Sequence, residues 1–282
     1  MLVVDAQVHI WGADTPERPW PPGNAHRVHR PQPFSKDDLL AEMAAAGVDR
    51  AVIVPPSWEG DRNDLALAAS QAHPDKFAVM GRPPLDVLKP GGPDPHALDR
   101  WREQTGMLGI RVTTAGAGAR QLFTDPEGDW LWQAAERAGL PAMVSVPGLL
   151  PAIGRLAERH PGMRFVIDHL ALVRDAKDEA AFGDLADLLA VARHPNVAAK
   201  ASALPRYSSE AYPYRRLHPF LKQVFDAFGP NRFFWGTDMT GIPCTYRQAV
   251  TLFTDELPWL TGGDRDLVMG RALCDWLRWK VA

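Results

Sequence analysis

Short apolar runs alternate with longer amphipathic stretches along the whole chain. Eight of these runs are rich in Val, Ile, Phe and Ala and have the length of buried strands. They comprise residues 2–10, 50–54, 76–81, 108–112, 141–146, 164–169, 196–200 and 232–237. Because most positions in such a run are apolar, and not every second one, the pattern predicts strands covered on both faces, as in a parallel sheet.

Helical periodicity separates the predicted strands. The stretches with apolar residues three and four positions apart are residues 36–46, 61–72, 126–138, 149–159, 178–192 and 214–228. Gly47, Gly139 and Gly229 follow three of them and supply the left-handed residue that ends a helix. This alternation predicts an α/β fold, a closed (β/α)8 TIM barrel formed by residues 1–282 as a single domain. No glycine-rich phosphate loop follows the first strand, which argues against a nucleotide-binding doubly wound sheet.

Composition and charge narrow the functional classes. The net charge of −3 offers no clustered basic surplus, so we expect neither nucleic acid nor a membrane surface as a partner. The two cysteines, Cys244 and Cys274, match neither a disulfide scaffold nor a paired-cysteine zinc site. No signal peptide or membrane-spanning stretch is evident. These features predict a cytoplasmic protein that binds a small-molecule substrate, and a homo-oligomer is compatible with them.

Polar residues gather where the predicted strands end. In a barrel the active site lies at the C-terminal ends of the strands. The polar residues found there are Gln7 and His9, Arg111, Asp168 and His169, Lys200 and Ser202, and Asp238. Asp5, Gln7 and His9 are spaced by two on the first strand, which places all three on one face. Buried polar groups are costly without a partner or a task, so we predict the site here, although Asp5 suits a structural role equally well.

Three segments carry a resemblance to a known family. They are DAQVHIW at residues 5–11, FVIDHL at residues 165–170 and FWGTD at residues 234–238. Taken together, in this order and spacing, they resemble the amidohydrolase 2 subgroup of the amidohydrolase superfamily. The resemblance spans nearly the whole chain and implies a barrel-shaped hydrolase.

The sequence departs from the metal-dependent members that it resembles. Those members carry two histidines on the first strand, and here the first of the pair is Gln7. They also carry a histidine at the end of the fifth strand, where residues 143–147 offer none. His9, His169 and Asp238 remain as donors, with none to spare for a site that needs at least three. We therefore expect no cofactor, and keep one zinc or manganese ion on these three side chains as the alternative.

The resemblance narrows to the lactonase branch of the subgroup, similar to pyrone dicarboxylate lactonase and sugar-lactone hydrolases. In that branch the aspartate of the last strand activates water. The resemblance therefore implies that Asp238 is the general base and that Gln7, His9 and His169 polarise the carbonyl of a lactone or a related small carboxylated ester. A water-poor pocket is expected to move the pKa of Asp238 towards the working pH.

Further residues are candidates for substrate contact. They are Arg111, Trp11, Trp58, Lys200 and Tyr207. Arg111 could clamp a substrate carboxylate, and a salt bridge to a neighbouring acid is an equal alternative. The long segment 12–34 has the features of a lid or binding loop, and we expect its histidines, like Arg206, to face solvent or substrate. Two other functions stay open: a divalent-metal amidohydrolase or decarboxylase, and a barrel that binds a metabolite without catalysis.

Overall fold

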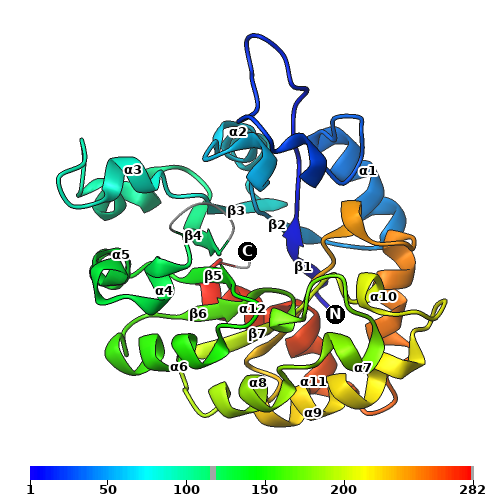
Figure 1. Cartoon of the computed structure of the whole chain (residues 1–282). Helices are drawn as coiled ribbons and strands as arrows, with labels where there is room; N and C mark the ends of the chain where they lie inside the picture. The colour runs from blue at the N-terminus through cyan, green and yellow to red at the C-terminus, as the bar shows by residue number, and fades with distance from the viewer. Residues whose placement is uncertain (115–118, 281–282) are drawn as a thin grey trace.

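Eight parallel strands in chain order form the centre of the molecule. The computed structural model describes residues 1–114 and 119–280. The strands are β1 (Val4–Val8), β2 (Arg50–Ile53), β3 (Phe77–Gly81), β4 (Met107–Thr113), β5 (Ala142–Ser145), β6 (Phe165–Ile167), β7 (Val197–Ala201) and β8 (Phe233–Trp235). Figure 1 shows the helices arranged around them. The predicted (β/α)8 barrel is therefore confirmed, with each strand inside or close to its predicted range.

Helices cover the outside of the barrel. The α-helices are α1 (Lys36–Ala46), α2 (Asp64–Ala72), α3 (Leu85–Leu88), α4 (Gln121–Thr124), α5 (Asp129–Arg137), α6 (Leu150–Arg159), α7 (Asp178–Ala181), α8 (Leu185–Val191), α9 (His218–Phe228), α10 (Tyr246–Thr254), α11 (Gly262–Asp266) and α12 (Ala272–Leu277). The stretch 178–192, predicted as one helix, is divided into α7 and α8. Helices α3, α4 and α10 to α12 lie outside the stretches with predicted helical periodicity. Within the described ranges, no helix has the length and apolar character needed to cross a membrane.

Short turns of tighter helix follow several strands. They are η1 (Ala25–Arg27), η2 (Ser57–Glu59), η3 (Ala97–Glu103), η4 (Pro126–Gly128), η5 (Asp168–Ala171), η6 (Leu204–Tyr207), η7 (Arg215–Leu217) and η8 (Met239–Gly241), whereas η9 (Leu267–Arg271) is a wider π-helical segment that leads into α12. Three of them, η5, η6 and η8, come soon after β6, β7 and β8. They turn the chain sharply at the strand ends where the polar residues gather.

Local sequence signals set the ends of two long helices. Ser35 precedes α1 and forms a reciprocal capping box with Asp38, and Thr245 precedes α10 and does the same with Gln248. Such caps each stabilise a helix by about 1 kcal/mol. Gly47 ends α1 in the left-handed conformation at φ 76°, as predicted. Gly139 and Gly229 also have positive φ, which confirms their predicted place after helices.

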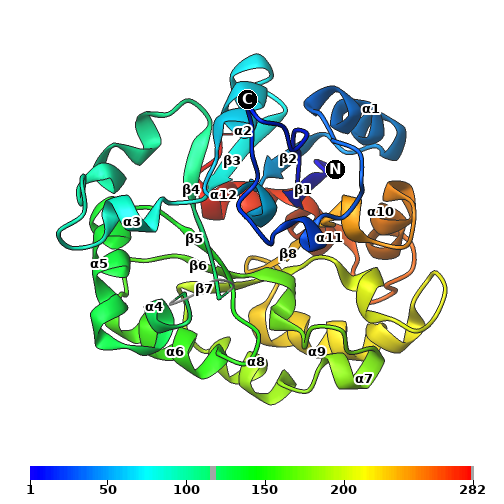
Figure 2. The same ribbon diagram turned by 45° about the horizontal axis from the view of Figure 1, so that its top comes forward.

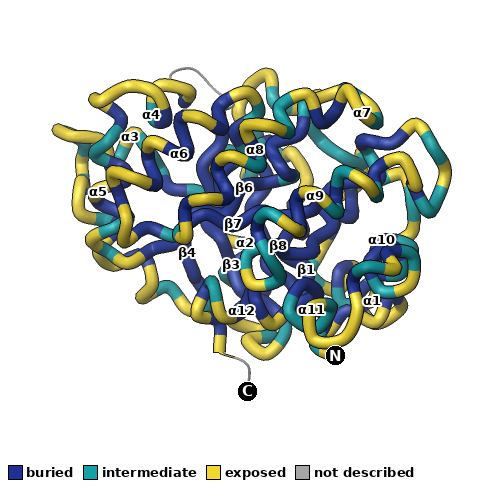
Figure 3. The backbone as a smooth tube through the Cα atoms, turned by 90° about the horizontal axis from the view of Figure 1, so that it is seen from below, coloured by how far each residue is buried: buried dark blue, intermediate teal, exposed yellow. Residues whose placement is uncertain are grey.

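Apolar side chains fill two layers, one inside the barrel and one between the strands and the helices. The inner layer includes Val4, Ala6 and Phe234 together with Leu273 and Leu277 of α12. Because the backbone oxygen of Trp276 in α12 accepts a hydrogen bond from Arg164, just before β6, this helix lies beneath the strand starts. Figure 3 shows the buried strands inside and the exposed outer faces of the helices. The strand ends opposite α12 are left for the site.

The prediction that Asp5, Gln7 and His9 share one face of β1 holds for Gln7 and His9, whose side chains lie 3.4 Å apart, and is wrong for Asp5. The carboxylate of Asp5 accepts a hydrogen bond from Tyr246 in the surrounding helix α10, at 2.8 Å. Gln7 instead contacts Lys200 of β7. The cause is an irregularity in the register of β1 between Asp5 and Val8, where the Gln7 N–H bonds the Asp5 side chain at 2.9 Å. One interrupted alternation is enough to separate two polar side chains.

Asp5 joins the first strand to the last. Its carboxylate accepts hydrogen bonds from the backbone N–H and the hydroxyl of Thr237, in addition to those from Gln7 and Tyr246. Gly236 permits the close approach, because a Cβ there would lie 3.0 Å from that of Ala6. Burial raises the pKa of Asp5 to about 6, although these donors act in the opposite direction. Its position supports the structural role.

Replacing Tyr246 with phenylalanine is expected to lower the free energy of unfolding by about 1.5–3 kcal/mol, the range for hydrogen bonds to charged groups. Urea denaturation followed by circular dichroism measures the change. Tyr214→Phe is the matched control, because the Tyr214 hydroxyl hydrogen-bonds the neutral thiol of Cys244. A larger loss in the control variant would contradict this account of Asp5.

Candidate active site

A cavity of about 870 Å³ opens at the C-terminal ends of the strands. The lining residues that the sequence singled out are Gln7, His9, Trp58, Arg111, Asp168, His169, Tyr207 and Asp238, with His26, His29 and Arg206 from loops. Figure 2 shows the dark blue segment between β1 and α1 passing over this end of the barrel. Segment 12–34 supplies part of the cavity wall through His26, Arg27 and His29.

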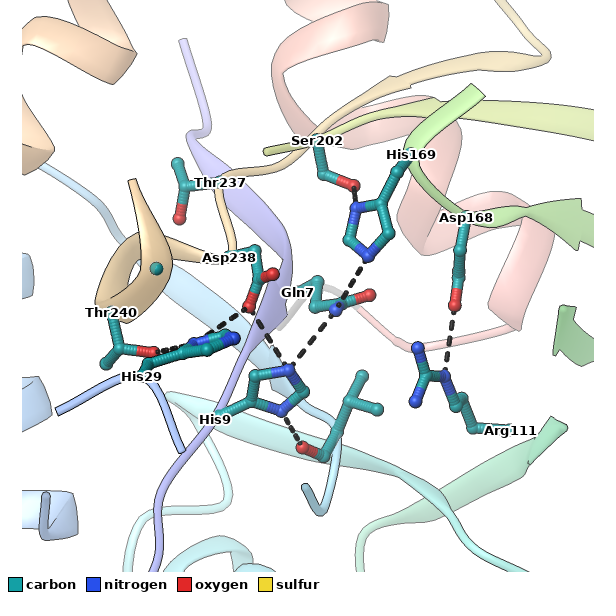
Figure 4. Close-up of polar contacts among 12 residues, drawn as sticks. Gln7, His9, His29, Arg111, Asp168, His169, Ser202, Thr237, Asp238 and Thr240 are labelled. Atoms are coloured by element: carbon teal, nitrogen blue, oxygen red, sulfur yellow. Dashed lines mark hydrogen bonds and ion pairs between the residues drawn. The ribbon is translucent and has the colours of Figure 1, made fainter. Parts of the chain in front are cut away.

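Asp238 and His9 form the central pair of the site. Oδ1 of Asp238 lies 3.1 Å from Nε2 of His9 and 3.9 Å from Nδ1 of His29. Figure 4 shows both contacts as dashed lines. The other ring nitrogen of His9 lies 2.5 Å from the carbonyl oxygen of Val54. A carbonyl oxygen only accepts, so Nδ1 of His9 carries a hydrogen. Nε2 is therefore the ring nitrogen of His9 that faces Asp238.

The electrostatic surroundings keep Asp238 ionised. Burial acts to raise the pKa of this carboxyl, but His9, His29 and His169 outweigh it and hold the pKa well below its usual value. Burial lowers the pKa of His29 and of His169 to about 4, so both rings are neutral at pH 7. The expected movement of the Asp238 pKa towards the working pH is therefore reversed, because the imidazole contacts outweigh burial.

The amide of Gln7 lies between two imidazole rings. Its oxygen is 2.5 Å from the ammonium of Lys200, and its nitrogen is 3.4 Å from Nε2 of both His9 and His169. Nδ1 of His169 faces the hydroxyl of Ser202 at 2.8 Å. Since Gln7 directs its N–H groups towards the rings, His169 accepts through Nε2 and donates through Nδ1.

Beneath the cavity one carboxylate binds two cations. Asp168 lies 2.6 Å from Nζ of Lys200 and 3.1 Å from Nε of Arg111. Burial raises the pKa of Asp168, but the two cations outweigh it and lower the value to about 2. Burial also lowers the pKa of Lys200, and Asp168 opposes that shift. Arg111 therefore forms the salt bridge that the sequence left open, while it also lines the cavity.

Several residues at the strand ends have a left-handed backbone. His169, Leu170 and Ala171 follow one another at φ 52°, 54° and 53°, and Asp238 has φ 54°. Such conformations cost about 1–3 kcal/mol each in residues other than glycine, and they concentrate at functional sites. The strained backbone therefore has a cost in free energy, and it directs the side chains of His169 and Asp238 into the same cavity.

A family model described as Amidohydrolase matches residues 4–259. The chain belongs to the amidohydrolase family. This confirms the resemblance to the amidohydrolase 2 subgroup that the three segments indicated.

This amidohydrolase is similar to two curated proteins. It is 27% identical over 249 residues to L-fucono-1,5-lactonase from Burkholderia ambifaria. The aligned region covers 83% of this chain and 79% of the relative. It is 26% identical over 242 residues to 4-sulfomuconolactone hydrolase from Hydrogenophaga intermedia, with 83% and 73% covered. A solved amidohydrolase from Burkholderia multivorans with bound zinc superposes with a TM-score of 0.80, at 20% identity and 99% coverage of both chains. This last likeness shows the shared fold.

Two residues predicted to contact substrate lie behind the cavity of the amidohydrolase. Trp11 is 2% exposed and packs edge-on against Trp58, with ring centroids 5.3 Å apart. Lys200 is fully buried beneath Gln7. Neither is among the lining residues. Their positions argue against direct substrate contact, because each is covered by the side chain in front of it.

Two loop residues come closer to Asp238 than their expected solvent-facing or substrate-facing placement implied. His29 hydrogen-bonds the hydroxyl of Thr240 at 2.9 Å. Arg206 donates to the carbonyl oxygen of Gly241 at 2.9 Å, and its Nη2 lies 3.8 Å from Oδ2 of Asp238. The unusual length of segment 12–34 was the available signal for His29. The sequence held no comparable signal for Arg206.

The donor set as arranged does not fit a divalent cation. The candidate donors in this amidohydrolase are His9, His169 and Asp238. A cation bound to both imidazoles would press against the N–H groups of Gln7, whose oxygen is already engaged by Lys200. Within residues 1–114 and 119–280, no group of three or more His, Cys, Asp or Glu could hold a metal ion.

Proposed function

We propose that this amidohydrolase opens a lactone, using water activated by Asp238 and no metal ion. One observation carries the proposal: an ionised carboxylate lies among three imidazoles at the cavity end of the barrel. The names of the two curated relatives, a lactonase and a lactone hydrolase, support the substrate class. A lactone suits such a site, because an ester demands less activation than an amide.

The reaction begins with a water molecule beside Asp238. The Asp238 carboxylate takes a proton from the water molecule while the water oxygen attacks the carbonyl carbon of the lactone. Such base catalysis contributes about 10²- to 10⁴-fold in rate. N–H groups of Gln7 and Arg111 stabilise the negative charge that develops on the carbonyl oxygen. His9 has no free N–H group for this role, since its two ring nitrogens face Val54 and Asp238. The ring C–O bond then breaks, the leaving oxygen takes a proton from the Asp238–His9 pair, and the product is a hydroxy acid.

His169 has a different part in this proposal from the one that the sequence implied. Its Nε2 accepts from Gln7 and carries no proton to offer to a carbonyl oxygen. It therefore orients the amide of Gln7, and Ser202 in turn fixes the ring. Gln7 supplies the N–H group in its place.

Cations around the cavity favour a substrate that carries a carboxylate. The basic lining residues are Arg27, Arg111, Arg174, Lys177 and Arg206. The acidic ones are Asp168, Asp175 and Asp238, and Asp168 is already paired with Lys200 and Arg111. The positive surplus attracts an anionic lactone into the cavity.

A lactone panel tests the proposal directly. We expect the purified protein to hydrolyse at least one carboxylated lactone, followed by acid release, at a rate that a chelator leaves unchanged. Loss of activity on chelation and its return with zinc would sink the metal-free mechanism. Binding of lactones without turnover of any would favour the non-catalytic alternative.

Replacing Arg174 with glutamine is expected to raise KM for a carboxylated lactone about tenfold, the equivalent of one charge-assisted hydrogen bond, with little change in kcat. A neutral lactone should show no such rise. Arg193→Gln, whose side chain is 71% exposed on the outer surface, is the control. Equal effects on the charged and neutral substrates would contradict a carboxylate-binding role.

A further inference from the structure

Lys200 is a fully buried cation to which the proposed reaction assigns no reacting atom. We propose that Lys200 is a positioning residue that acts through Gln7. Its ammonium group fixes the Gln7 amide so that an N–H donor occupies the space between His9 and His169, where a divalent cation would need to bind, and it adds a positive charge beneath that space. The chain therefore rejects such a cation. This inference concerns the site of the proposed lactone hydrolysis. It rests on the proposed function only in assuming that the Gln7 amide held by Lys200 takes part in that reaction.

The contacts of Lys200 determine the orientation of the Gln7 amide. Nζ lies 2.5 Å from the Gln7 side-chain oxygen, 2.6 Å from Asp168 and 3.4 Å from the sulfur of Met143. An ammonium group can only donate hydrogen bonds. The atom of Gln7 that faces it must therefore be the oxygen, and the amide nitrogen must face the other way.

This orientation of the Gln7 amide engages the ring nitrogen of His169 that a metal ion would need. The amide nitrogen lies 3.4 Å from Nε2 of His169, whose other nitrogen faces Ser202. The lone pair on Nε2 of His169 is then already engaged by an N–H group. The Gln7 amide nitrogen also lies 3.4 Å from Nε2 of His9, so the positive end of the amide dipole occupies the space between the two rings.

The charge balance beneath the site points the same way. Asp168 is the carboxylate that pairs with Lys200, and it pairs with Arg111 as well. One negative charge thus faces two positive ones, and all three groups are buried. This surplus opposes the attraction that Asp238 exerts on a divalent cation, since charges in a poorly hydrated interior are weakly screened.

Zinc binding tests the inference apart from activity. Four proteins are compared by equilibrium dialysis against zinc at pH 7.5: wild type, Lys200→Met, Gln7→His and the double variant. We expect one equivalent of zinc in the double variant, and at least tenfold weaker binding in Gln7→His, which gains a ligand but keeps the ammonium. Stoichiometric zinc on the wild type, equal binding by Gln7→His and the double variant, or no zinc on a folded double variant would each overturn the proposal.

The wild-type protein provides a second test that does not depend on a variant's folding. Nitrogen NMR of labelled histidines reports which ring nitrogen carries the proton, with His169→Asn used for assignment. We expect Nε2 of His169 unprotonated and Nδ1 protonated from pH 6 to 8. Lys200→Arg should keep this tautomer and Lys200→Met should lose it. A proton on Nε2 in the wild type would overturn the proposal.

The two proposals can fail separately. If zinc binds the wild type while lactone hydrolysis resists chelation, the role of Lys200 is wrong and the proposed reaction stands. If the wild type excludes zinc and the His169 tautomer is as expected, yet no lactone is hydrolysed, only the proposed function fails.

Discussion

Replacing Asp238 with asparagine is expected to lower kcat for lactone hydrolysis by about 10²- to 10⁴-fold, the usual contribution of a general base. The asparagine keeps the shape of the side chain but cannot take a proton from water. The contact with His9 at 3.1 Å is the interaction that changes most. Steady-state kinetics with the best lactone of the panel measures the loss, and KM should change much less than kcat.

The control for this variant is Asp187→Asn, because Asp187 is exposed on α8, away from the cavity. Circular dichroism and the unfolding midpoint establish that both variants are folded. Activity of Asp238→Asn within threefold of the wild type would rule out Asp238 as the base. The reaction would then need another group beside the histidines.

Replacing Asp168 with asparagine should have the largest effect on stability. The change leaves the buried cations Lys200 and Arg111 without their shared carboxylate, and breaking a buried pair in this way costs about 3–5 kcal/mol. Urea unfolding at pH 7 measures the difference. Asp226→Asn is the matched control: it removes an exposed pair with Lys222, worth about 0.3–0.5 kcal/mol.

The pH dependence of this difference has a defined sign. The pKa of Asp168 is about 2 in the folded protein, below the ordinary value of 3.8. A depressed pKa stabilises the folded state above the unfolded value, and that stabilisation is lost as pH falls through the folded value. The gap in unfolding free energy between wild type and Asp168→Asn should therefore narrow between pH 4 and 2. A gap that widens there would contradict the assignment.

The sequence predicted the barrel because its signals are local and repeated. Eight apolar runs separated by helical periodicity leave few other arrangements, and the barrel rule then places polar strand ends such as His9 and Asp238 around one opening. The prediction for Asp5 failed for a local reason as well. A single irregularity in β1 reverses the alternation of inward-facing and outward-facing side chains, and no residue type in this segment predicts it.

Contacts between distant segments were beyond reach from the sequence. Lys200 and Gln7 lie 193 positions apart and meet only because β7 and β1 face the same interior. Trp11 follows β1 as Trp58 follows β2, yet only Trp58 reaches the cavity. Which of the two rings lies in front depends on how segment 12–34 folds back, and tertiary packing decides that.

The position of α12 has a practical consequence. This last helix packs beneath the strand starts, and the carbonyl oxygen of Lys280 accepts a hydrogen bond from Arg50 at the beginning of β2. The end of the described chain is therefore held on the side of the barrel away from the cavity. A bead, an electrode or a fusion partner attached through a C-terminal linker would face away from the opening, so an immobilised preparation should keep its access to dissolved substrate.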